Sequence, residues 1–341
     1  REVMLTPLRP IRIRTLQIDP PLLLAPMAGL THTAFRQMIV NFGGCGLLST
    51  EMLSEKRLPT ETPAISPYLI RTVGEQPLSY QLLTSTPDEI PRAVEMLHRF
   101  RADAIDINMG CPAPSVGKFG AGSSLMDQPQ VARSIVAEAR KSTSLPLTAK
   151  IRLGAELNEG KLRDFCVMLQ DEGIDMISVH ARLKHEPFSR QPRWSWISKV
   201  KKWVAIPVIA NGGIFTVLDA KACLAASGAD GLMLGRGAAI RPWLFAEISR
   251  ELCGSDIAAP EVSLQAVYVR FIDLLDLHFK PEHRIGRLKE FTHYFAKNYQ
   301  FGHHLAMKVQ TSQSVEEARE RAERFFEQAE IRVGHANALG A

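Results

Sequence analysis

The sequence predicts a (β/α)8 TIM barrel followed by a C-terminal all-helical domain, because strand-like and helix-like segments alternate over most of its 341 residues. Over the first three-quarters of the chain, short apolar runs alternate with stretches of 3.6-residue periodicity. Eight such units occupy about 235 residues, which is the size of a (β/α)8 barrel. A doubly wound sheet would need a G-x-G-x-x-G turn after its first strand, and that turn is absent. We therefore predict a barrel in residues 1–250 and a helical domain in residues 251–341.

The eight predicted strands are short, and most lie between segments with helical periodicity. The strands are Leu22–Ala25, Leu47–Thr50, Leu78–Leu82, Ala104–Asn108, Leu147–Ile151, Met176–His180, Val208–Ala210 and Leu232–Leu234. The helical segments are Pro87–Arg101, Gln130–Lys141, Lys161–Glu172 and Val217–Ala226. The proline-rich segment Met52–Gln76 is irregular and is expected to form a loop near the active site.

Composition points to an ordinary globular enzyme, with 45% hydrophobic and 23% charged residues. The five cysteines are odd in number and lack the spacing of metal ligands, which argues for a reducing compartment and against a disulfide framework or a metal site. No apolar run approaches the roughly 18 residues that a membrane span needs. Since no signal-peptide pattern is found at the amino end either, we expect a cytoplasmic protein without membrane contact.

Polar side chains follow the predicted strands at the points where the strands end. Because the carboxyl ends of barrel strands converge on one face, these groups are expected to share a pocket. In chain order they are Pro26-Met27-Ala28, Glu51, Gln81, Asn108 with Cys111, Lys150 with Arg152, His180 with Arg182, Asn211-Gly212-Gly213, and Gly235-Arg236.

The segment Asn108-Met109-Gly110-Cys111-Pro112 is the most informative of these strand ends. Gly110 and Pro112 stop the strand and turn the chain, which holds an amide and a thiol at its tip. A free cysteine is often only a small buried hydrophobe. Here the flanking glycine and proline favour an exposed active loop that carries Cys111.

Glycines after the last two predicted strands indicate a phosphate site. Asn211-Gly212-Gly213 and Gly235-Arg236 leave backbone amides uncovered beside an arginine, as in many barrel enzymes. A sugar phosphate, pyridoxal phosphate or flavin mononucleotide (FMN) would fit, and Lys150 could form the Schiff base that pyridoxal phosphate needs. Gln81 and the backbone of Pro26-Met27-Ala28 instead suit the edge of a flavin ring, with Lys150 near its N1–O2 region.

A basic block near the carboxyl end of the chain suggests a second function. The segment from Lys280 to Lys308 contains six lysines and arginines but only two acidic residues, and several aromatic residues lie among them. Such a block is typical of a nucleic-acid-binding surface, but it also fits a solvated helix face whose aromatic residues belong to the core. The sequence does not decide between the two interpretations.

These motifs resemble the dihydrouridine synthases, flavin enzymes that reduce uridine in tRNA, over about Leu22 to Ile248. The resemblance rests on Ala25-Pro26-Met27-Ala28-Gly29, Asn108-Met109-Gly110-Cys111-Pro112, Lys150-Ile151-Arg152-Leu153-Gly154, His180-Ala181-Arg182, Asn211-Gly212-Gly213-Ile214 and Gly235-Arg236. Gly235-Arg236 running into Arg241-Pro242-Trp243-Leu244-Phe245 is most similar to the B-type bacterial branch. Two features depart from the family pattern: Gly213 replaces the usual Asp, and the loop Leu183–Arg193 is atypical.

The resemblance implies a role for each group. Reduction of the uracil C5–C6 bond requires a hydride at C6, which reduced FMN would supply after its own reduction by NADPH or NADH, and a proton at C5, which Cys111 would supply. The uracil would be framed by Asn108, Lys150, His180 and Arg182. The FMN would contact Pro26, Met27, Ala28, Gln81, Lys150, His180, Asn211, Gly212, Gly213, Gly235 and Arg236. The helical domain would bind tRNA through Lys280, Arg284, Arg287, Lys289 and Lys297.

Two alternatives belong to other functional classes. A flavin barrel that reduces a free pyrimidine or enone would not need RNA, and the basic block counts against it. A non-catalytic RNA-binding protein would not need Cys111, Lys150 and His180 together. We expect a monomeric tRNA-dihydrouridine synthase without a protein partner or a bound metal.

Overall fold

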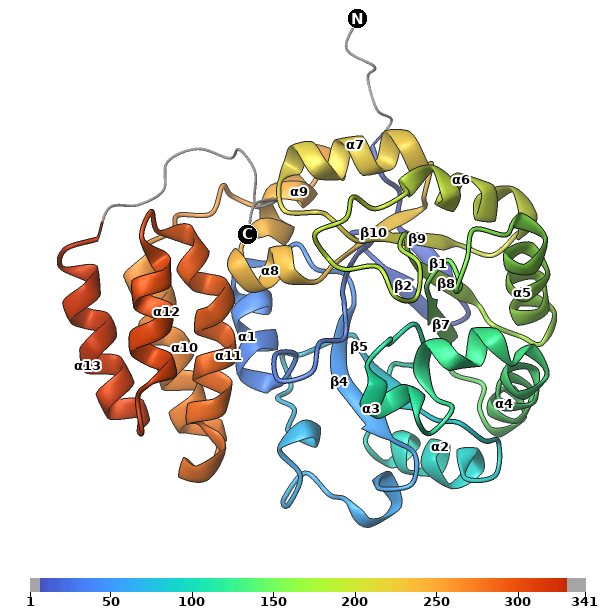
Figure 1. The fold of residues 1–341 in the computed structure, drawn as a ribbon, viewed down its shortest axis with the longest axis horizontal. Helices are drawn as coiled ribbons and strands as arrows, with labels where there is room; N and C mark the ends of the chain where they lie inside the picture. Colours follow the sequence, from blue (N-terminus) through green and yellow to red (C-terminus); the bar gives the residue numbers. More distant parts are fainter. Residues whose placement is uncertain (1–6, 330–341) are drawn as a thin grey trace, which may run out of the picture.

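The computed structural model describes residues 7–329 and shows an eight-stranded parallel barrel beside a group of helices (Figure 1). The strands pair in the order β3-β10-β9-β8-β7-β6-β5-β4. A parallel bridge between Leu23 and Leu47 brings the two ends of this sheet together. The predicted TIM barrel is therefore confirmed.

All eight predicted strands are present with small changes in their ends. They are β3 (Leu22–Leu24), β4 (Leu48–Ser54), β5 (Leu78–Leu83), β6 (Ala104–Met109), β7 (Leu147–Ile151), β8 (Met176–His180), β9 (Val208–Asn211) and β10 (Gly231–Leu234). The largest difference is β4, which continues to Ser54 and contains Glu51 instead of ending before it. A register shift between Ser49 and Met52 lets β4 extend along β5.

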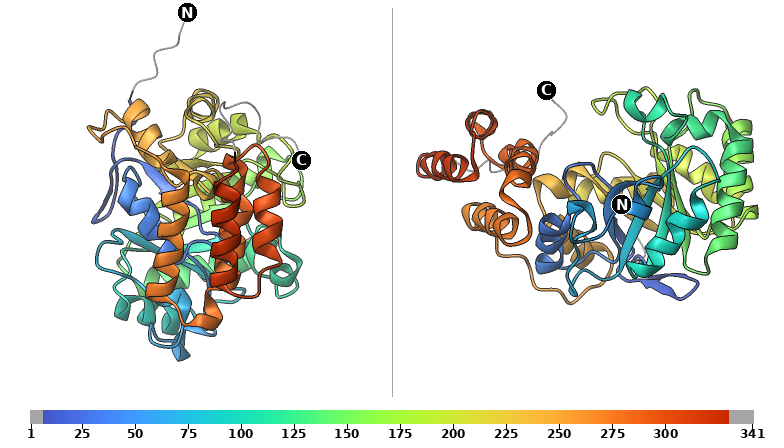
Figure 2. Two further views of the ribbon diagram at one scale, coloured as in Figure 1. Left: turned by 90° about the vertical axis from the view of Figure 1, so that its left-hand side faces the viewer. Right: turned by 90° about the horizontal axis from the view of Figure 1, so that it is seen from below.

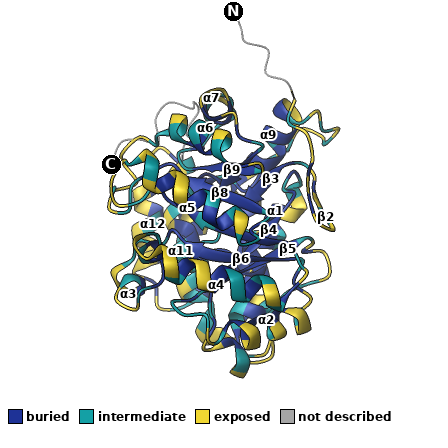
Figure 3. Ribbon diagram, turned by 90° about the vertical axis from the view of Figure 1, so that its right-hand side faces the viewer, coloured by how far each residue is buried: buried dark blue, intermediate teal, exposed yellow. Residues whose placement is uncertain are grey.

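Helices surround the barrel and bury one face against it, so that their outer faces are exposed (Figure 3). The helices are α1 (Thr33–Phe42), α2 (Ile90–Arg99), α3 (Pro114–Gly117), α4 (Pro129–Ser142), α5 (Glu159–Asp171), α6 (Trp194–Trp203), α7 (Val217–Ser227), α8 (Arg236–Ile240) and α9 (Leu244–Leu252). Side chains cap two of them, because Asn158 accepts from the Lys161 N–H and Thr216 from the Asp219 N–H. Within residues 7–329, no helix combines the length and the apolar character of a membrane span.

A short antiparallel hairpin, β1 (Ile11–Ile13) and β2 (Leu16–Ile18), precedes the barrel and was not predicted. Its isoleucines are buried in a cluster with Met176, Ile209 and Met233 from barrel strands. Ile11 also lies beside Gly231, the first residue of β10. The hairpin thus packs against the amino-terminal side of the barrel, away from the strand ends that carry the predicted site.

Up to residue 329, the carboxyl-terminal region contains four α-helices that pack beside α1 and α8 (Figures 1 and 2). They are α10 (Leu264–His278), α11 (Ile285–Phe295), α12 (Gly302–Gln310) and α13 (Val315–Phe326). The predicted helical region is confirmed as far as residue 329, whereas residues 330–341 lie outside the described part. Since α9 crosses residue 250, the predicted division into two domains at that point stays a prediction.

The aromatic residues of the basic block mostly belong to the core. Phe291, Phe295 and Tyr299 are buried, and the rings of Phe271 and Phe291 stack with their centroids 3.9 Å apart. Phe301, by contrast, is exposed. For Phe291, Phe295 and Tyr299, the interpretation that the aromatic residues of the block belong to the core is confirmed.

A buried ion pair connects the irregular segment before β5 to α1. Arg36 and Glu75 are both fully buried, and Arg36 Nε lies 2.6 Å from Glu75 Oε1. Arg36 also donates to the carbonyls of Thr31 and Ile70, while Glu75 Oε2 accepts from Thr72 N, Thr72 Oγ1 and Thr33 Oγ1. Every polar atom of the pair therefore has a partner, as a buried pair requires.

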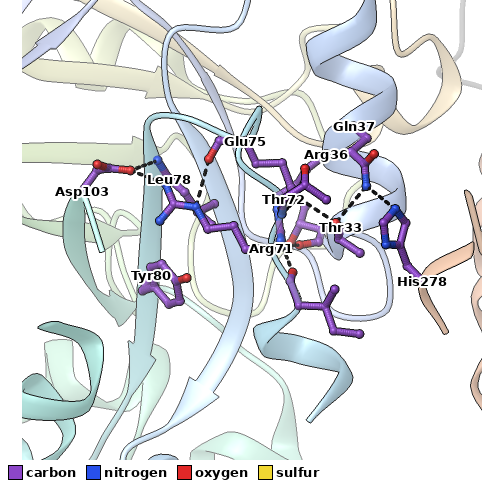
Figure 4. Close-up of polar contacts among 12 residues, drawn as sticks. Thr33, Arg36, Gln37, Arg71, Thr72, Glu75, Leu78, Tyr80, Asp103 and His278 are labelled. Carbon is purple, nitrogen blue, oxygen red and sulfur yellow. Dashed lines mark hydrogen bonds and ion pairs between the residues drawn. The ribbon is translucent and has the colours of Figure 1, made fainter. Parts of the chain in front are cut away.

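The same network reaches the carboxyl-terminal helices (Figure 4). Gln37 Nε2 lies 3.0 Å from Thr33 Oγ1 and 2.8 Å from Nε2 of His278, the last residue of α10. On the other side, Arg71 donates to the Glu75 carbonyl and contacts Asp103 Oδ2 at 2.6 Å. One polar network therefore links α10, α1 and the start of the β5–β6 pair.

Replacing Arg36 with Ala should lower the free energy of unfolding by about 3–5 kcal/mol, because it leaves the buried Glu75 carboxylate without its cation. Urea denaturation followed by circular dichroism would measure the change. Arg99→Ala is the matched control, since Arg99 pairs with Glu95 on an exposed helix face and should matter little. Equal losses for the two variants would contradict this role of the buried pair.

Candidate active site

A cavity of about 360 Å³ lies at the carboxyl ends of the barrel strands. Every residue predicted to bind a cofactor contributes to its wall, together with Asn108 and Cys111. Gln81, Asn108 and Lys150 come from the neighbouring strands β5, β6 and β7, whereas Asn211 and Gly235 come from β9 and the turn after β10. The structure therefore brings these residues together at one cavity, and their function as a site stays a prediction.

Four polar side chains on the neighbouring strands β5, β6 and β7 form a continuous chain of hydrogen bonds. Gln81 Nε2 donates to Asp106 Oδ2 at 2.7 Å, and Asn108 Nδ2 donates to Gln81 Oε1 at 3.0 Å. Thr148 Oγ1 donates to the other Asp106 oxygen at 2.6 Å. Burial raises the pKa of the Asp106 carboxyl, while the Thr148 and Gln81 hydrogen bonds oppose that rise. Asp106 was not predicted as a site residue, because it lies inside a strand.

Asn108 also holds the turn that carries the thiol. Its Oδ1 accepts hydrogen bonds from the backbone N–H groups of Gly110 and Cys111, at 3.1 and 3.0 Å. The Cys111 carbonyl accepts from the Ser123 N–H at 2.9 Å, and a side chain at Gly122 would come within 2.5 Å of that carbonyl. The turn is thus fixed from two sides, and Cys111 is partly exposed at the cavity wall, as predicted.

Lys150, on β7, is a cation whose pKa is shifted by its surroundings. Burial and the nearby Arg152 lower the pKa of Lys150 to about 8, although Asp106 opposes the shift. Near neutral pH most of its ammonium groups remain charged and can donate hydrogen bonds into the cavity.

The surroundings of His180 keep its ring neutral and determine which ring nitrogen carries the proton. Burial, followed by the positive charges of Lys150 and Arg152, lowers the pKa of His180 well below its usual value. Arg182 Nη1 lies 2.9 Å from His180 Nε2. Because a guanidinium can only donate, Nε2 must accept, and the proton of the neutral ring lies on Nδ1. His180 is therefore a hydrogen-bond donor through Nδ1.

Arg182 itself does not reach the cavity wall, unlike the other residues predicted around the uracil. It is fully buried and donates to the backbone carbonyls of Phe188 and Arg190 as well as to His180. Arg152, the residue directly after β7, acts similarly and donates to the carbonyls of Gly110 and Leu183. The two arginines tie the loop 183–193 to the barrel, which the sequence had not indicated.

The glycines after β9 adopt conformations that other residues rarely adopt. Gly212 and Gly213 have φ angles of 111° and 73°. A side chain at Gly212 would lie 2.7 Å from His180 Cδ2, and one at Gly213 would lie 2.8 Å from Pro192 Cγ. The departure from the family's usual Asp at Gly213 thus coincides with an atypical loop whose Pro192 fills the adjacent space.

Arg236 also lines the cavity and lies near two aromatic rings. Its guanidinium carbon is 4.3 Å from the ring centre of Phe188 and 5.2 Å from that of Phe215. From the carboxyl-terminal helices, α11 contributes Glu290 and Tyr294 to the same wall. The sequence missed these two, because contacts between distant regions leave no local pattern.

The five residues predicted to bind RNA have different environments. Lys280 is exposed and Lys289 partly exposed, whereas Arg284 donates to the Phe279 and Asp276 carbonyls. Arg287 faces a cavity between α11 and the barrel. Burial, followed by the positive charge of Arg236, lowers the pKa of Lys297. Their contact with RNA stays a prediction.

In the described part of the chain, no group of three or more His, Cys, Asp and Glu side chains has the geometry of a metal site. The donors at the cavity wall are instead amides, an ammonium, an imidazole and a guanidinium. Together with glycine amides and the apolar Met27 and Ala28, they fit an elongated, partly aromatic molecule with an anionic end.

Comparisons with known proteins agree with this class of site. The family model for dihydrouridine synthase (Dus) matches residues 23–339. A probable tRNA-dihydrouridine synthase 1 of Synechocystis sp. is 38% identical over 246 residues, which cover 70% of this chain and 67% of that protein. The tRNA-dihydrouridine(16) synthase of Aquipseudomonas alcaligenes is 34% identical over 305 residues, covering 86% and 96% of the two chains. This chain belongs to the dihydrouridine synthase family, an enzyme family, as its motifs predicted.

Solved structures of lower identity share the fold. Histamine dehydrogenase from Rhizobium sp. 4-9 superposes with a TM-score of 0.55 at 13% identity, covering 78% of this chain and 50% of that one. An old yellow enzyme homologue from Zymomonas mobilis gives 0.53 at 13% identity, covering 76% and 94%. The assignment to the B-type branch is not tested by these matches and stays a prediction.

Replacing Arg182 with Met should raise the pKa of His180, because it removes a positive charge and the donor that keeps Nε2 unprotonated. NMR titration of histidine-labelled protein would measure the shift. Arg190→Met is the matched control, since that side chain belongs to the same loop but is exposed and pairs with Glu186. If the pKa of His180 were unchanged in Arg182→Met, the assignment of the ring proton to Nδ1 would be contradicted.

Proposed function

We propose that this protein is a tRNA-dihydrouridine synthase that reduces the C5–C6 bond of specific uridines with FMN and NADPH or NADH. The single observation that carries the proposal is the convergence of Cys111, Asn108, Lys150 and His180 on one cavity whose wall also holds glycine amides and Arg236. Family membership supports the same reaction. We also keep the predictions of a cytoplasmic monomer without a protein partner.

The residues at the cavity fit FMN. Gly212, Gly213 and Gly235 leave backbone amides free of side chains, and Arg236 adds a positive charge for the phosphate. Met27 and Ala28 offer an apolar surface for the ring system, and Lys150 and Gln81 offer polar groups for its edge. When bound, reduced FMN would supply the hydride that no side chain of the protein can provide.

Cys111 would give the proton. A thiol can act as a general acid when it is held beside the atom that receives the proton. The turn fixed by Asn108 and Gly122 holds this thiol at the cavity wall. When the hydride adds at C6, Cys111 would transfer its proton to C5, and its thiolate would recover a proton from solvent.

Three donors would stabilise the charge that develops on the uracil oxygens. Lys150 offers an ammonium, His180 a neutral ring with the proton on Nδ1, and Asn108 an amide that is already oriented by Gln81. Because Arg182 is used by backbone carbonyls, it would act through the position of His180 and the loop, without touching the uracil.

RNA binding by the helical region completes the proposal. A uridine in folded RNA must leave its stack to enter the cavity, which costs a few kcal/mol. Lys280 and Lys289 expose positive charge on the helices beside the barrel, where phosphate contacts would offset that cost. A flavin reductase of free pyrimidines or enones would gain nothing from these contacts.

Cys111→Ala should separate the two half-reactions. Flavin reduction by NADPH takes no proton from Cys111, so its rate in stopped-flow measurements should stay close to that of the unchanged protein. Formation of dihydrouridine in a tRNA transcript should fall by roughly two to four orders of magnitude, the usual contribution of a positioned acid. Cys253→Ala is the control, because Cys253 lies outside the cavity. An equal loss in both half-reactions would refute the assignment.

Arg236→Glu should weaken FMN binding, because it replaces an attraction for the phosphate with a repulsion. The ratio of flavin absorbance to protein after purification would measure the loss. Arg241→Glu serves as the comparison, since Arg241 pairs with Glu247 and does not line the cavity. Full retention of FMN by Arg236→Glu would show that the phosphate binds elsewhere.

A further inference from the structure

A second cavity of about 620 Å³ lies between the barrel and α11, and the proposed reaction gives it no role. We call it the interdomain cavity; its wall includes Glu51, Arg57, Glu61, Tyr68, Arg287 and Glu290. Its volume is in the range of about 300–1,000 Å³ that is typical of ligand sites. Ala28, Met52 and Glu290 line both this cavity and the active-site cavity. A group bound in one would therefore lie next to a group bound in the other.

Two charged side chains in this wall, the buried Glu51 and the partly buried Arg287, each have a buried polar atom without a partner. Glu51 is only 3% exposed; its Oε1 accepts from the Gly29 N–H at 2.5 Å, whereas its Oε2 has no partner. Arg287 donates through Nη1 to the His283 carbonyl, whereas its buried Nε has no partner. Although the two groups have opposite charges, they form no ion pair within 4.0 Å. An unpaired buried polar group is costly and calls for an explanation.

Arg287 is held in place and does not behave as a flexible surface arginine. Its guanidinium carbon lies 4.5 Å from the ring centre of Phe279. Its positive charge also contributes to the lowered pKa of the buried His32, whose ring packs edge-on against Phe279. The guanidinium therefore keeps its position on α11, opposite the carboxylate of Glu51.

The charges of the wall favour a neutral group over a phosphate. Four carboxylates line the interdomain cavity, from Glu51, Glu61, Glu282 and Glu290, but only two guanidiniums, from Arg57 and Arg287. A phosphate would be repelled by this excess of negative charge. A group with N–H donors on one edge and an acceptor on another would satisfy both unpaired atoms.

Resting on the proposed function, we propose that the interdomain cavity binds a guanine base of the RNA that lies close in sequence to the target uridine. Glu51 accepts hydrogen bonds from the guanine N1–H and N2–H2 groups, and Arg287 donates to its O6 or N7. Guanine is the base whose two adjacent donors face a carboxylate without an intervening acceptor. In uracil, cytosine and adenine, a carbonyl or ring nitrogen beside the donor would repel the second carboxylate oxygen.

The test uses the full-length FMN protein and a tRNA transcript whose reduced uridine has been mapped. Each guanosine within three nucleotides of that uridine is replaced in turn with inosine, which lacks the N2 amino group. At one position, inosine should lower kcat/KM for dihydrouridine formation about tenfold, the usual effect of losing one base contact. In Glu51→Gln, the difference between guanosine and inosine at that position should disappear.

Two further variants make the test decisive. Arg287→Met should also lose the difference in kcat/KM between guanosine and 7-deazaguanosine at that position. The Arg287 side chain does not line the active-site cavity. Glu282→Gln is the matched control, because Glu282 is an exposed carboxylate of the same wall and should leave discrimination unchanged. The FMN content of every variant should be compared with that of the unchanged protein.

Other outcomes would overturn the proposal. If no inosine position matters, or if Glu51→Gln lowers kcat/KM equally for the guanosine and inosine transcripts, the cavity does not recognise guanine. If Arg287→Met instead reduces the salt dependence of binding to all transcripts, Arg287 contacts a phosphate. A complete absence of dihydrouridine with the unchanged protein would contradict the proposed function itself, which is a separate result.

Discussion

The hydrogen bonds among Asp106, Gln81 and Asn108 are the constraint on which the geometry of the site depends. A carboxylate at Asp106 can only accept, so Gln81 must turn its amide nitrogen toward it and its oxygen toward Asn108. Asn108 must then donate through Nδ2, which leaves its oxygen to accept from the backbone at Gly110 and Cys111. A buried carboxylate on β6 thereby fixes the position of a thiol beyond the end of the strand.

The attachment of the helical region follows a similar directional logic. Glu75 accepts from Thr33 Oγ1, so the Thr33 oxygen is free to accept from Gln37. The second N–H of Gln37 then points to His278 Nε2, which must accept and therefore carries no proton. Burial is the largest influence on the pKa of His278 and lowers it. A lowered pKa favours the neutral ring that this arrangement requires. This contact between α1 and α10 belongs to the same helical region in which Arg287 and Tyr294 of α11 lie over the carboxyl end of the barrel.

The sequence predicted the barrel and its catalytic end because parallel strands are buried on both faces and read as apolar runs. The polar residues that interrupt these runs then locate the cavity, as Gln81 and Lys150 show. The β1–β2 hairpin was missed, since strands of three residues are too short to show a period. Arg182 was misplaced relative to the cavity wall, because side-chain direction after a strand depends on the loop that follows.

The position of the carboxyl-terminal helices could not be predicted, for a different reason. Periodicity identifies a helix and its apolar face, but it does not say which other element covers that face. Phe291 and Phe295 therefore looked equally suited to RNA and to a core, and only their stacking in the structure decides for the core. Glu290 and Arg287, on the same helix, could not be assigned to the barrel mouth before the helices were placed.

Charge is distributed unequally between the two neighbouring cavities. At the active-site cavity, Arg152 and Arg182 are held mainly by backbone carbonyls, which position their guanidiniums without neutralising them. With Lys150 and Arg236 they create a positive field, which adds to the larger effect of burial in lowering the pKa of His180. That field suits a phosphate or an oxygen that becomes negative during reduction. The interdomain cavity has the opposite character, because carboxylates predominate there. Two adjoining cavities of opposite charge can therefore receive the reacting uracil in one and a donor-bearing base in the other.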